Sequence, residues 1–378
     1  MGGAFRPSHR AVGVRAAQIP PPSPLRPWRA TSPARGEGPH DPVRRFVARR
    51  VGLGVITLLG VLVLVFLLTH YLPGNPALVK AGQFGNPRAI AAMEHQMGLD
   101  RPLPVQFRDY LVGLVHLDLG TSFNTGQPVA SDLRSRLPAT VELALWSTVA
   151  AVLVGVPFGI WAGLRPGSAR DVVVSGLAIF GTSLPLFWLG LVILFLFYAQ
   201  LRITPAPDGR LSPFVAPPPT ITGLYSIDSL VTGDFDTFPD AVAHLFMPVL
   251  TLAIVEVAPI LKIARSATID VMRTDYVRTA RALGLSAWQI IRQDLLRNVG
   301  VQLLTVVGIV LGYLLAGSVL VERIFNWPGV GLYAWNAMLS NDLAAVQGFI
   351  LLAAVIYIGL NLVIDVLYAF VDPRIRYA

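Results

Sequence analysis

The chain has 378 residues, of which 54% are hydrophobic and only 14% charged, and its mean hydropathy is +0.60. Soluble domains carry about 25% charged residues, so the composition argues against a soluble globular protein and indicates an integral membrane protein. The chain contains no cysteine, which excludes disulfides and thiolate metal sites.

The N-terminal segment has the composition of a tail. Nine prolines fall before residue 43 and little apolar periodicity is present, so the segment cannot bury enough surface to fold. We predict a disordered cytoplasmic tail over residues 1–43. The basic stretch RRFVARR then precedes the first apolar run, which is too long for a cleavable signal and is interpreted as a membrane span.

Six long apolar runs follow, and each predicts a membrane-spanning helix, which needs about 20 mostly apolar residues. The fourth run, FMPVLTLAIVEVAPILKIA, is shorter and contains Glu256 and Lys262, yet it still predicts a span with a functional or snorkelling charge. We therefore predict an all-α polytopic membrane protein, with a six-span transmembrane domain over residues 44–378. The runs lie between Arg50 and Lys80, Glu142 and Arg165, Asp171 and Arg202, Asp240 and Glu256, Arg297 and Glu322, and Asp342 and Asp365.

The basic residues predict the orientation of these spans. With the N-terminus inside, segments 1–50, 164–171, 262–297 and 371–378 are cytoplasmic and hold 21 of the 30 Lys and Arg residues. Such residues concentrate on the cytoplasmic side of membrane proteins, so both termini are predicted to be cytoplasmic. The formal charge of +8 reflects this asymmetry, and the expected partner is membrane lipid and not nucleic acid.

Three external loops follow from this topology. The first, about residues 72–138, predicts a short helix near 86–100 and a Pro-started amphipathic helix after it, whose apolar side would be Val105, Tyr110, Leu111, Leu114 and Leu117. The second, about residues 202–245, is rich in Pro, Gly, Thr and Asp. The third, residues 322–342, is aromatic and glycine-containing, which suits a re-entrant or interface-lying turn.

The cytoplasmic loop of about residues 265–297 has a helical rhythm. Gly284 predicts a left-handed helix end, and Ser286 with Gln289 forms a capping box that predicts a second helix. A bilayer-surface helix and a docking helix for a cytosolic protein both fit, whereas a DNA-binding helix-turn-helix fits poorly between two spans. The apolar stripe comprises Val277, Ala280, Gly284, Trp288, Ile291 and Leu295.

Charged residues near the spans mark candidate contacts. A charge at membrane depth usually faces a cavity or another charge, so Glu256 is predicted either to line a translocation path or to pair within the protein, for example with Lys262. Asp365 is expected at the cytoplasmic edge, and Glu322 and Arg323 at the external end of the fifth span.

Small residues and prolines within the spans predict packing and kinks. Gly308, Gly312, Ala316 and Gly317 suit close helix contact, either with a second subunit or within one. The prolines expected to kink their spans are Pro157, Pro185, Pro248 and Pro259.

Two enzyme classes lack their required residues. A phosphate-binding loop needs Gly-Lys before Ser or Thr, but Lys80 and Lys262 follow Val79 and Leu261. The sequence GTSLP at 181–185 contains Gly-x-Ser, yet a serine nucleophile needs a base, and no histidine follows His244. The six histidines also show no metal-ligand spacing.

At the cytoplasmic loop the chain resembles the permease subunits of ATP-binding-cassette (ABC) importers, whose hallmark is Glu-Ala-Ala-x-x-x-Gly. Here Ala280 and Gly284 fit, whereas Arg278 and Thr279 depart from Glu-Ala. The form YVRTARALGL with a later LLRN is similar to the peptide-importer branch. The stretches MGLDRPLPVQFRDYL, DLGTSF, RLPATVELA, NWPGVGLY and VDPRIRY are similar to the first ("B") permease of dipeptide, oligopeptide and nickel importers, over about residues 44–378.

This resemblance implies a type I ABC permease fold and a non-catalytic half-pore in the bacterial inner membrane. The expected partners are a second permease subunit, two ATP-binding subunits that would hold ATP and Mg, and an extracytoplasmic peptide-binding protein; no cofactor is expected in this chain. A stand-alone secondary carrier or channel is the alternative. The translocation path is predicted to include Glu256, Gly312 and Gly317. The predicted ATPase-docking residues are Tyr276, Arg278, Thr279, Ala280, Leu283, Gly284, Leu285 and Ser286.

Overall fold

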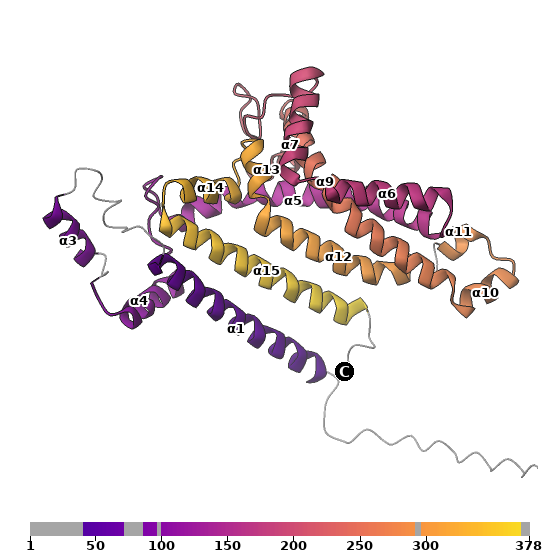
Figure 1. The fold of residues 1–378 in the computed structure, drawn as a ribbon, viewed down its shortest axis with the longest axis horizontal. Coiled ribbons are helices and arrows are strands. Elements are labelled where there is room, and N and C mark those ends of the chain that lie inside the picture. Colours follow the sequence, from indigo (N-terminus) through magenta and orange to yellow (C-terminus); the bar gives the residue numbers. More distant parts are fainter. Residues whose placement is uncertain (1–40, 72–85, 97–99, 292–295, 372–378) are drawn as a thin grey trace, which may run out of the picture. The chain divides into compact units, whose positions relative to one another are not determined.

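A computed structural model describes residues 41–71, 86–96, 100–291 and 296–371. The chain divides into two compact units, Met1–Asp41 and Pro42–Ala378, and the predicted tail falls almost wholly outside the described residues. Where residues are described, the regular structure is helical, apart from one isolated bridge between Thr121 and Pro128 (Figure 1). The helices are α1 (Asp41–Tyr71), α3 (Pro87–Gln96), α4 (Leu103–Val115), α5 (Val129–Gly163), α6 (Ala169–Ser183), α7 (Leu186–Leu194), the π-helical η1 (Phe195–Gln200), α8 (Tyr225–Thr232), α9 (Thr237–Met272), α10 (Asp275–Ala282), α11 (Ala287–Ile290), α12 (Leu296–Gly317), α13 (Val319–Ile324), α14 (Val330–Leu339) and α15 (Leu343–Val371).

Four helices among the described residues, namely α1, α5, α9 and α15, are long and apolar enough to cross a membrane. A fifth span exists if α6 is counted together with α7 and η1, which turn by 97° at Leu184 and Pro185. The remaining predicted span, the fifth in chain order, falls on α12, whose described apolar part, Gln302–Leu315, is shorter. The all-helical membrane fold is therefore confirmed, whereas the number of six spans stays a prediction.

Glycines allow α5 and α9 to pack backbone to backbone. A Cβ on Gly159 would lie 2.6 Å from the carbonyl oxygen of Leu261, and one on Gly163 would lie 2.8 Å from that of Arg265. Together with Gly155, these residues form a stripe spaced by four along α5, the small-residue pattern that brings membrane helices close. Such contacts were predicted for the fifth span, and this stripe in α5 was not predicted.

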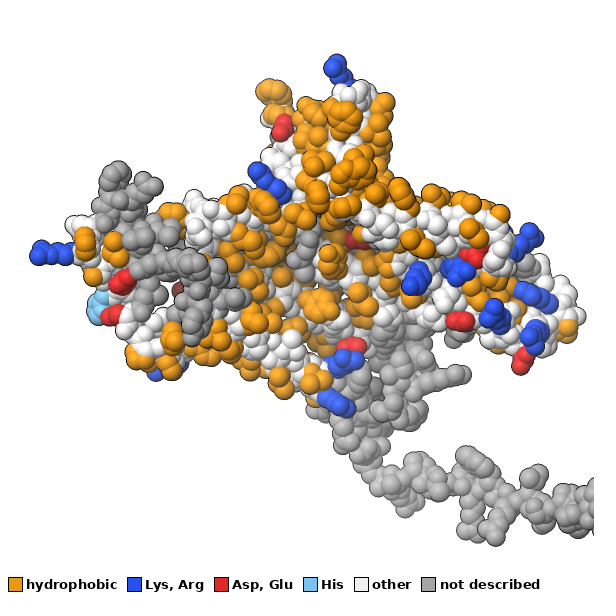
Figure 2. All heavy atoms as spheres, viewed as in Figure 1, with side chains coloured by type: hydrophobic (Ala, Val, Ile, Leu, Met, Phe, Trp, Pro, Cys, Tyr) orange, Lys and Arg blue, Asp and Glu red, His pale blue; other side chains and the backbone are white. Residues whose placement is uncertain are grey.

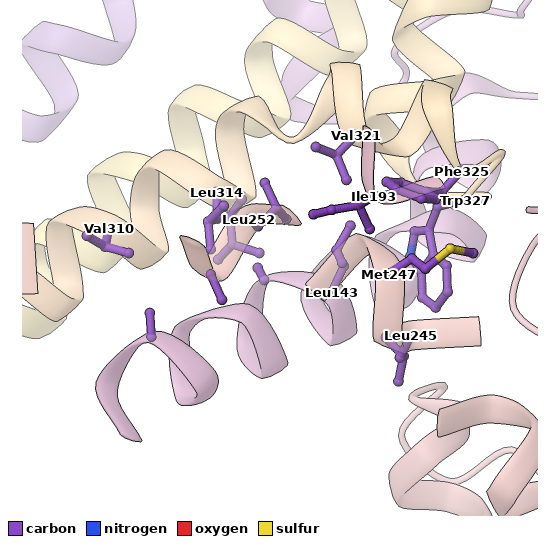
Figure 3. Close-up of a cluster of buried hydrophobic side chains, with 14 of the residues drawn as sticks. Leu143, Ile193, Leu245, Met247, Leu252, Val310, Leu314, Val321, Phe325 and Trp327 are labelled. Atoms are coloured by element: carbon purple, nitrogen blue, oxygen red, sulfur yellow. The ribbon is translucent and has the colours of Figure 1, made fainter. Parts of the chain in front are cut away.

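The largest apolar core forms where α5, α7, α9, α12 and α13 meet (Figure 3). Leu143 of α5, Ile193 of α7 and Leu314 of α12 point into this cluster. Trp327 is almost fully buried at its edge, and its indole N–H donates to the carbonyl oxygen of Ala139 over 2.8 Å. The core therefore joins segments that are widely separated in sequence.

The first and last long helices meet at one end. Arg50 near the start of α1 pairs with Asp365 near the end of α15 over 3.0 Å. A Cβ on Gly54 of α1 would likewise touch the side chain of Ile358. The two helix ends that lead to the chain termini are thus held side by side.

The small residues of α12 pack within the chain where they are described. Gly308 lies against Ile364 of α15, and Gly312 lies against Tyr357 of the same helix. The surroundings of Ala316 and Gly317 lie outside the described side chains. At Gly308 and Gly312 the structure therefore shows contact within one subunit, the second of the two predicted alternatives.

The segments predicted to be external contain more helix than their sequences indicate. The second loop contains α8 and the beginning of α9, and α14 in the third loop is packed in protein, with Tyr333 and Ala334 buried. In the first loop, the predicted apolar side of the amphipathic helix is wrong at its ends. Val105 is exposed, and Leu117 lies beyond the end of α4 with 79% of its surface exposed.

Candidate functional site

The turn between α10 and α11 has the geometry that its sequence predicts. Gly284 has φ +84°, which confirms the left-handed conformation. The N–H of Leu285 donates to the carbonyl of Ala280 over 3.1 Å, and the N–H of Gly284 donates to that of Arg281 over 3.0 Å. These paired bonds form a Schellman motif, which satisfies the last carbonyls of α10.

The second helix begins with the predicted capping box. The backbone N–H of Ser286 donates to Oε1 of Gln289 over 2.8 Å, and the N–H of Gln289 donates to Oγ of Ser286 over 3.3 Å. This reciprocal pair confirms the start signal for α11. The side chain of Trp288 and all of Leu295, both in the predicted stripe, lie outside the described residues.

One face of this loop packs onto its own chain. Val277 and Ala280 of α10 are buried with Ile290 of α11 against Val271 of α9 and Val299 of α12. The loop is therefore anchored where α9 ends and α12 begins. Of the predicted docking residues, Ala280 points inward and Leu285 is half-buried in the same cluster.

The opposite face is exposed and basic. Leu283 at the turn is 77% exposed, and Tyr276, Arg278 and Thr279 are also exposed. Figure 2 shows Lys and Arg side chains gathered around this end of the protein. A Cβ on Gly284 would meet no atom within 4 Å. The loop thus presents an exposed tip at Leu283 and Gly284 whose backbone conformation is fixed.

Glu256 lies inside the helix bundle. It is only 6% exposed, and its Oε2 has no hydrogen-bond partner among the described residues. Helices α5 and α9 run in the same direction, and Gly155 of α5 lies against Ile260 of α9. Measured along the helix axes, Ser147 and Thr148 of α5 are therefore within roughly two turns of Glu256. Their buried hydroxyls also lack partners within the described segments. Lys262 is exposed and makes no described ion pair with Glu256.

A second polar group, which sequence reasoning missed, lies near the middle of α5. Glu142 is fully buried and accepts bonds from Arg210 over 2.6 Å and from the N–H and hydroxyl of Ser226. The Arg210 guanidinium also covers the Tyr225 ring, 3.4 Å from its centroid. Here the second external loop is tied to a spanning helix by a fully satisfied buried ion pair.

Glu322 forms a third polar group. It is fully buried and accepts bonds from the hydroxyls of Thr140 and Ser318 and from the N–H of Leu332. The Thr140 hydroxyl in turn accepts from the N–H of Val330. These bonds satisfy two N–H groups at the beginning of α14, so the carboxylate serves as a helix cap from outside the helix.

Asp228 organises the turn before α8. Burial raises the pKa of a carboxyl group, but the Thr222 hydroxyl and the N–H groups of Ile221, Thr222 and Gly223 donate to Asp228, and together they hold its pKa below the usual range. The ionised carboxylate therefore stabilises this turn. We call the three groups around Glu142, Glu322 and Asp228 the external cap, after the side on which the predicted orientation places them.

Across the described ranges, no three His, Asp or Glu side chains are grouped in a way that could hold a metal ion.

Two protein-family models match the chain. Residues 155–377 match the binding-protein-dependent transport system inner membrane component, and residues 43–144 match the N-terminal part of such membrane components. Together the matches cover nearly all of residues 43–377, including the predicted first external loop.

Relatives of similar length also match. The chain is 42% identical to the probable D,D-dipeptide transport system permease protein DdpB of Escherichia coli strain K12, covering 85% of this chain and 94% of that protein. It is 38% identical to the dipeptide transport system permease protein DppB of the same strain, covering 88% and 99%. It is 40% identical to the di/tripeptide transport system permease protein DppB of Pseudomonas aeruginosa strain UCBPP-PA14, covering 88% and 98%.

Among solved structures, a chain of the inward-facing MetNI methionine ABC transporter matches with a TM-score of 0.47 and 16% identity. The match covers 64% of this chain and 96% of that one.

Proposed function

The chain belongs to the family of binding-protein-dependent transport system inner membrane components, and on this premise we propose that it passes peptides across the membrane as half of a pore. It is a non-catalytic permease subunit of an ABC importer. Three relatives that match over at least 85% of this chain are named for dipeptide or di/tripeptide transport, which supports small peptides as the substrate. In this proposal an extracytoplasmic binding protein delivers the peptide, and a second permease subunit completes the pore.

The loop of α10 and α11 is the proposed docking site for an ATP-binding subunit. The observation that supports it is the division of the loop into two faces. Val277 and Ala280 fix it to α9 and α12, while Leu283 and Gly284 form an outward tip. A bilayer-surface helix would be expected to bury an apolar face in lipid, but the apolar face of α10 is already buried in this chain. Tyr276, Arg278, Thr279 and Ser286 complete the proposed contact surface.

Glu256 is the proposed polar residue of the translocation path, with Gly312 and Gly317 as further candidates. Its buried, unpartnered oxygen is an energetically costly feature in a membrane protein and supports a role beyond packing. Because Glu256 is enclosed by its own chain, exposure to substrate would require α9, together with the α5 backbone packed on it, to move relative to the other helices. Gly312 faces Tyr357, so its exposure would require α12 and α15 to separate.

The proposed orientation places both termini in the cytoplasm. The Arg50–Asp365 pair supports a common side for the two helix ends. The basic tip near α10 would then face the ATP-binding subunits, and the external cap would face the binding protein.

The decisive experiment is uptake of labelled dipeptides into vesicles that hold the complete importer. ATP-dependent uptake that needs this chain is expected. Uptake of single amino acids or metal complexes with no uptake of any peptide would contradict the proposed substrate. Glu256→Gln should lower uptake while the complex still assembles. Loss of assembly would instead assign Glu256 a structural role.

A further inference from the structure

The amphipathic helix α4 packs at one end of α1. The Phe66 ring of α1 contacts Phe107, with centroids 5.1 Å apart, and Tyr110, with centroids 6.0 Å apart. Phe66 is buried by these contacts. Helix α4 is therefore held against α1 by one side.

The position of this contact gives the depth of α4. The apolar window of α1 runs over Ala48–Leu67 and has 20 residues. At about 1.5 Å per residue such a window is about 30 Å long, which matches the hydrocarbon core of a bilayer. Phe66 is the next-to-last residue of the window and Arg50 is near its start. Helix α4 therefore lies at the membrane boundary on the other side of the bilayer from Arg50.

The side of α4 turned away from α1 is largely apolar and uncovered. Val105, Val112 and Val115 are exposed, and no residue of this helix is fully buried. Arg108 lies on the same side, where a long basic side chain can extend its charge toward headgroups. Leu64 and Leu67 of α1, one or two residues from Phe66, are also apolar and exposed, so both helices present apolar surface at this depth.

The turn after α4 has a leucine in a backbone conformation that usually requires glycine. It is a Schellman turn like that at Gly284, with bonds from Leu117 N–H to the Leu114 carbonyl and from Asp118 N–H to the Gly113 carbonyl. The left-handed position holds Leu117, at φ +59°, where glycine is the usual residue. A leucine kept in a strained conformation with its side chain exposed points to a role for that side chain outside the chain.

We propose that α4 and the Leu117 turn form a membrane-surface element, with Val105, Val112, Val115 and Leu117 inserted into the lipid at this boundary. Tyr110 suits this depth, since tyrosine is enriched at membrane interfaces. The Arg101–Asp109 pair, 3.0 Å long, lies beside this face and remains in water. The element fixes the end of α1, whose described apolar window is otherwise little buried by protein.

The absence of native cysteine allows a direct test. Single cysteines replace Val112, Val115, Leu117 or, as the control, Asp109 in the full-length chain purified with its partner subunits. Each variant is spin-labelled in nanodiscs of phosphatidylethanolamine and phosphatidylglycerol. Collision with oxygen should exceed collision with a water-soluble nickel chelate at the first three positions, and the order should reverse at Asp109→Cys.

Leu117→Gly tests the side chain without breaking the turn, because glycine adopts this φ freely. The nickel accessibility of a label at position 112 should then rise, because burial of a leucine side chain in an apolar environment shifts an equilibrium by about tenfold or more. Equal nickel accessibility at all four labelled positions would overturn the proposal. So would protection that develops only when the binding protein is added, because the face would then be a protein-docking surface.

Discussion

The external cap and the α10–α11 loop are held by different forces. In the cap, the buried carboxylates of Glu142 and Glu322 accept hydrogen bonds from segments up to 182 residues away, and Asp228 accepts from the turn just before its own helix. In the loop, the hydrogen bonds are local, and a small apolar cluster supplies the anchorage. Buried polar networks enforce one arrangement because each unmade bond is costly. The cap is thus fixed by the chain itself, while the outer face of the loop is exposed and is the surface proposed to bind an ATP-binding subunit.

The largest expected change is a loss of stability when the buried ion pair of the external cap is broken. Arg210→Met leaves Glu142 buried without its counter-charge, which should cost about 3–5 kcal/mol of stability. Thermal unfolding of the purified protein measures this loss. Arg323→Met, at an exposed arginine, is the matched control and should change stability by no more than about 0.5 kcal/mol. Equal stability of the two variants would contradict the idea that the cap depends on the buried pair.

The next effect depends on pH. Because the folded-state pKa of Asp228 is lowered, its contribution is complete above the unfolded-state value near 3.8 and is lost as the pH falls through the folded-state pKa. Asp228→Asn should cost about 1.5–3 kcal/mol at neutral pH, the range for hydrogen bonds to a charged group. The difference in unfolding temperature between the two proteins should shrink on acidification below about pH 4. A constant difference down to pH 2 would assign the stability to the shape of the side chain and not to its charge.

A smaller effect on stability should have a large effect on assembly. Gly284→Val forces a β-branched residue into the left-handed region, at a local cost of about 1–2 kcal/mol. Affinity for the ATP-binding subunit should fall about tenfold or more, and uptake should fall with it, while the unfolding temperature changes little.

Gly167→Val is the matched control for this substitution. Gly167 has φ +78° with open space around it, but it lies in the turn between α5 and α6. Co-purification with the ATP-binding subunit should distinguish the two variants. If both bind it as well as the native chain does, the loop is not the docking site.

The smallest effect concerns charge at the tip. Arg278 is exposed and pairs only with Asp275 of its own helix over 3.3 Å in the described structure. Arg278→Ala should therefore change stability by at most about 1 kcal/mol and should lower ATPase affinity less than Gly284→Val does. The difference should diminish in high salt, which screens exposed charges. A loss larger than that of Gly284→Val would make charge, not turn shape, the main recognition feature.

Local chemistry explains which features the sequence could predict. The Gly284 turn and the Ser286–Gln289 box depend on spacings of a few residues, so their conformation could be read directly. The Glu142–Arg210 pair could not be, because it joins a spanning helix to a loop 68 residues later. The 97° turn at Pro185 exceeded the predicted kink, since packing of α7 against α9 and α13 sets its direction. Glu322 was predicted only to mark the boundary of a span. Its burial could not be predicted, because it depends on the packing of α14 against it.

Because of the glycine stripe, α5 and α9 are expected to tilt together as one rigid pair. With backbone atoms in contact at Gly159 and Gly163, no flexible side chains remain there to absorb a displacement. Glu142 and Gly163 are separated by about 32 Å along α5. A tilt of the helix pair by about 10° about its Gly163 end would therefore move the Glu142 end by roughly 5–6 Å. A small displacement where α9 leads into α10 would in this way become a larger one at the far end of the pair.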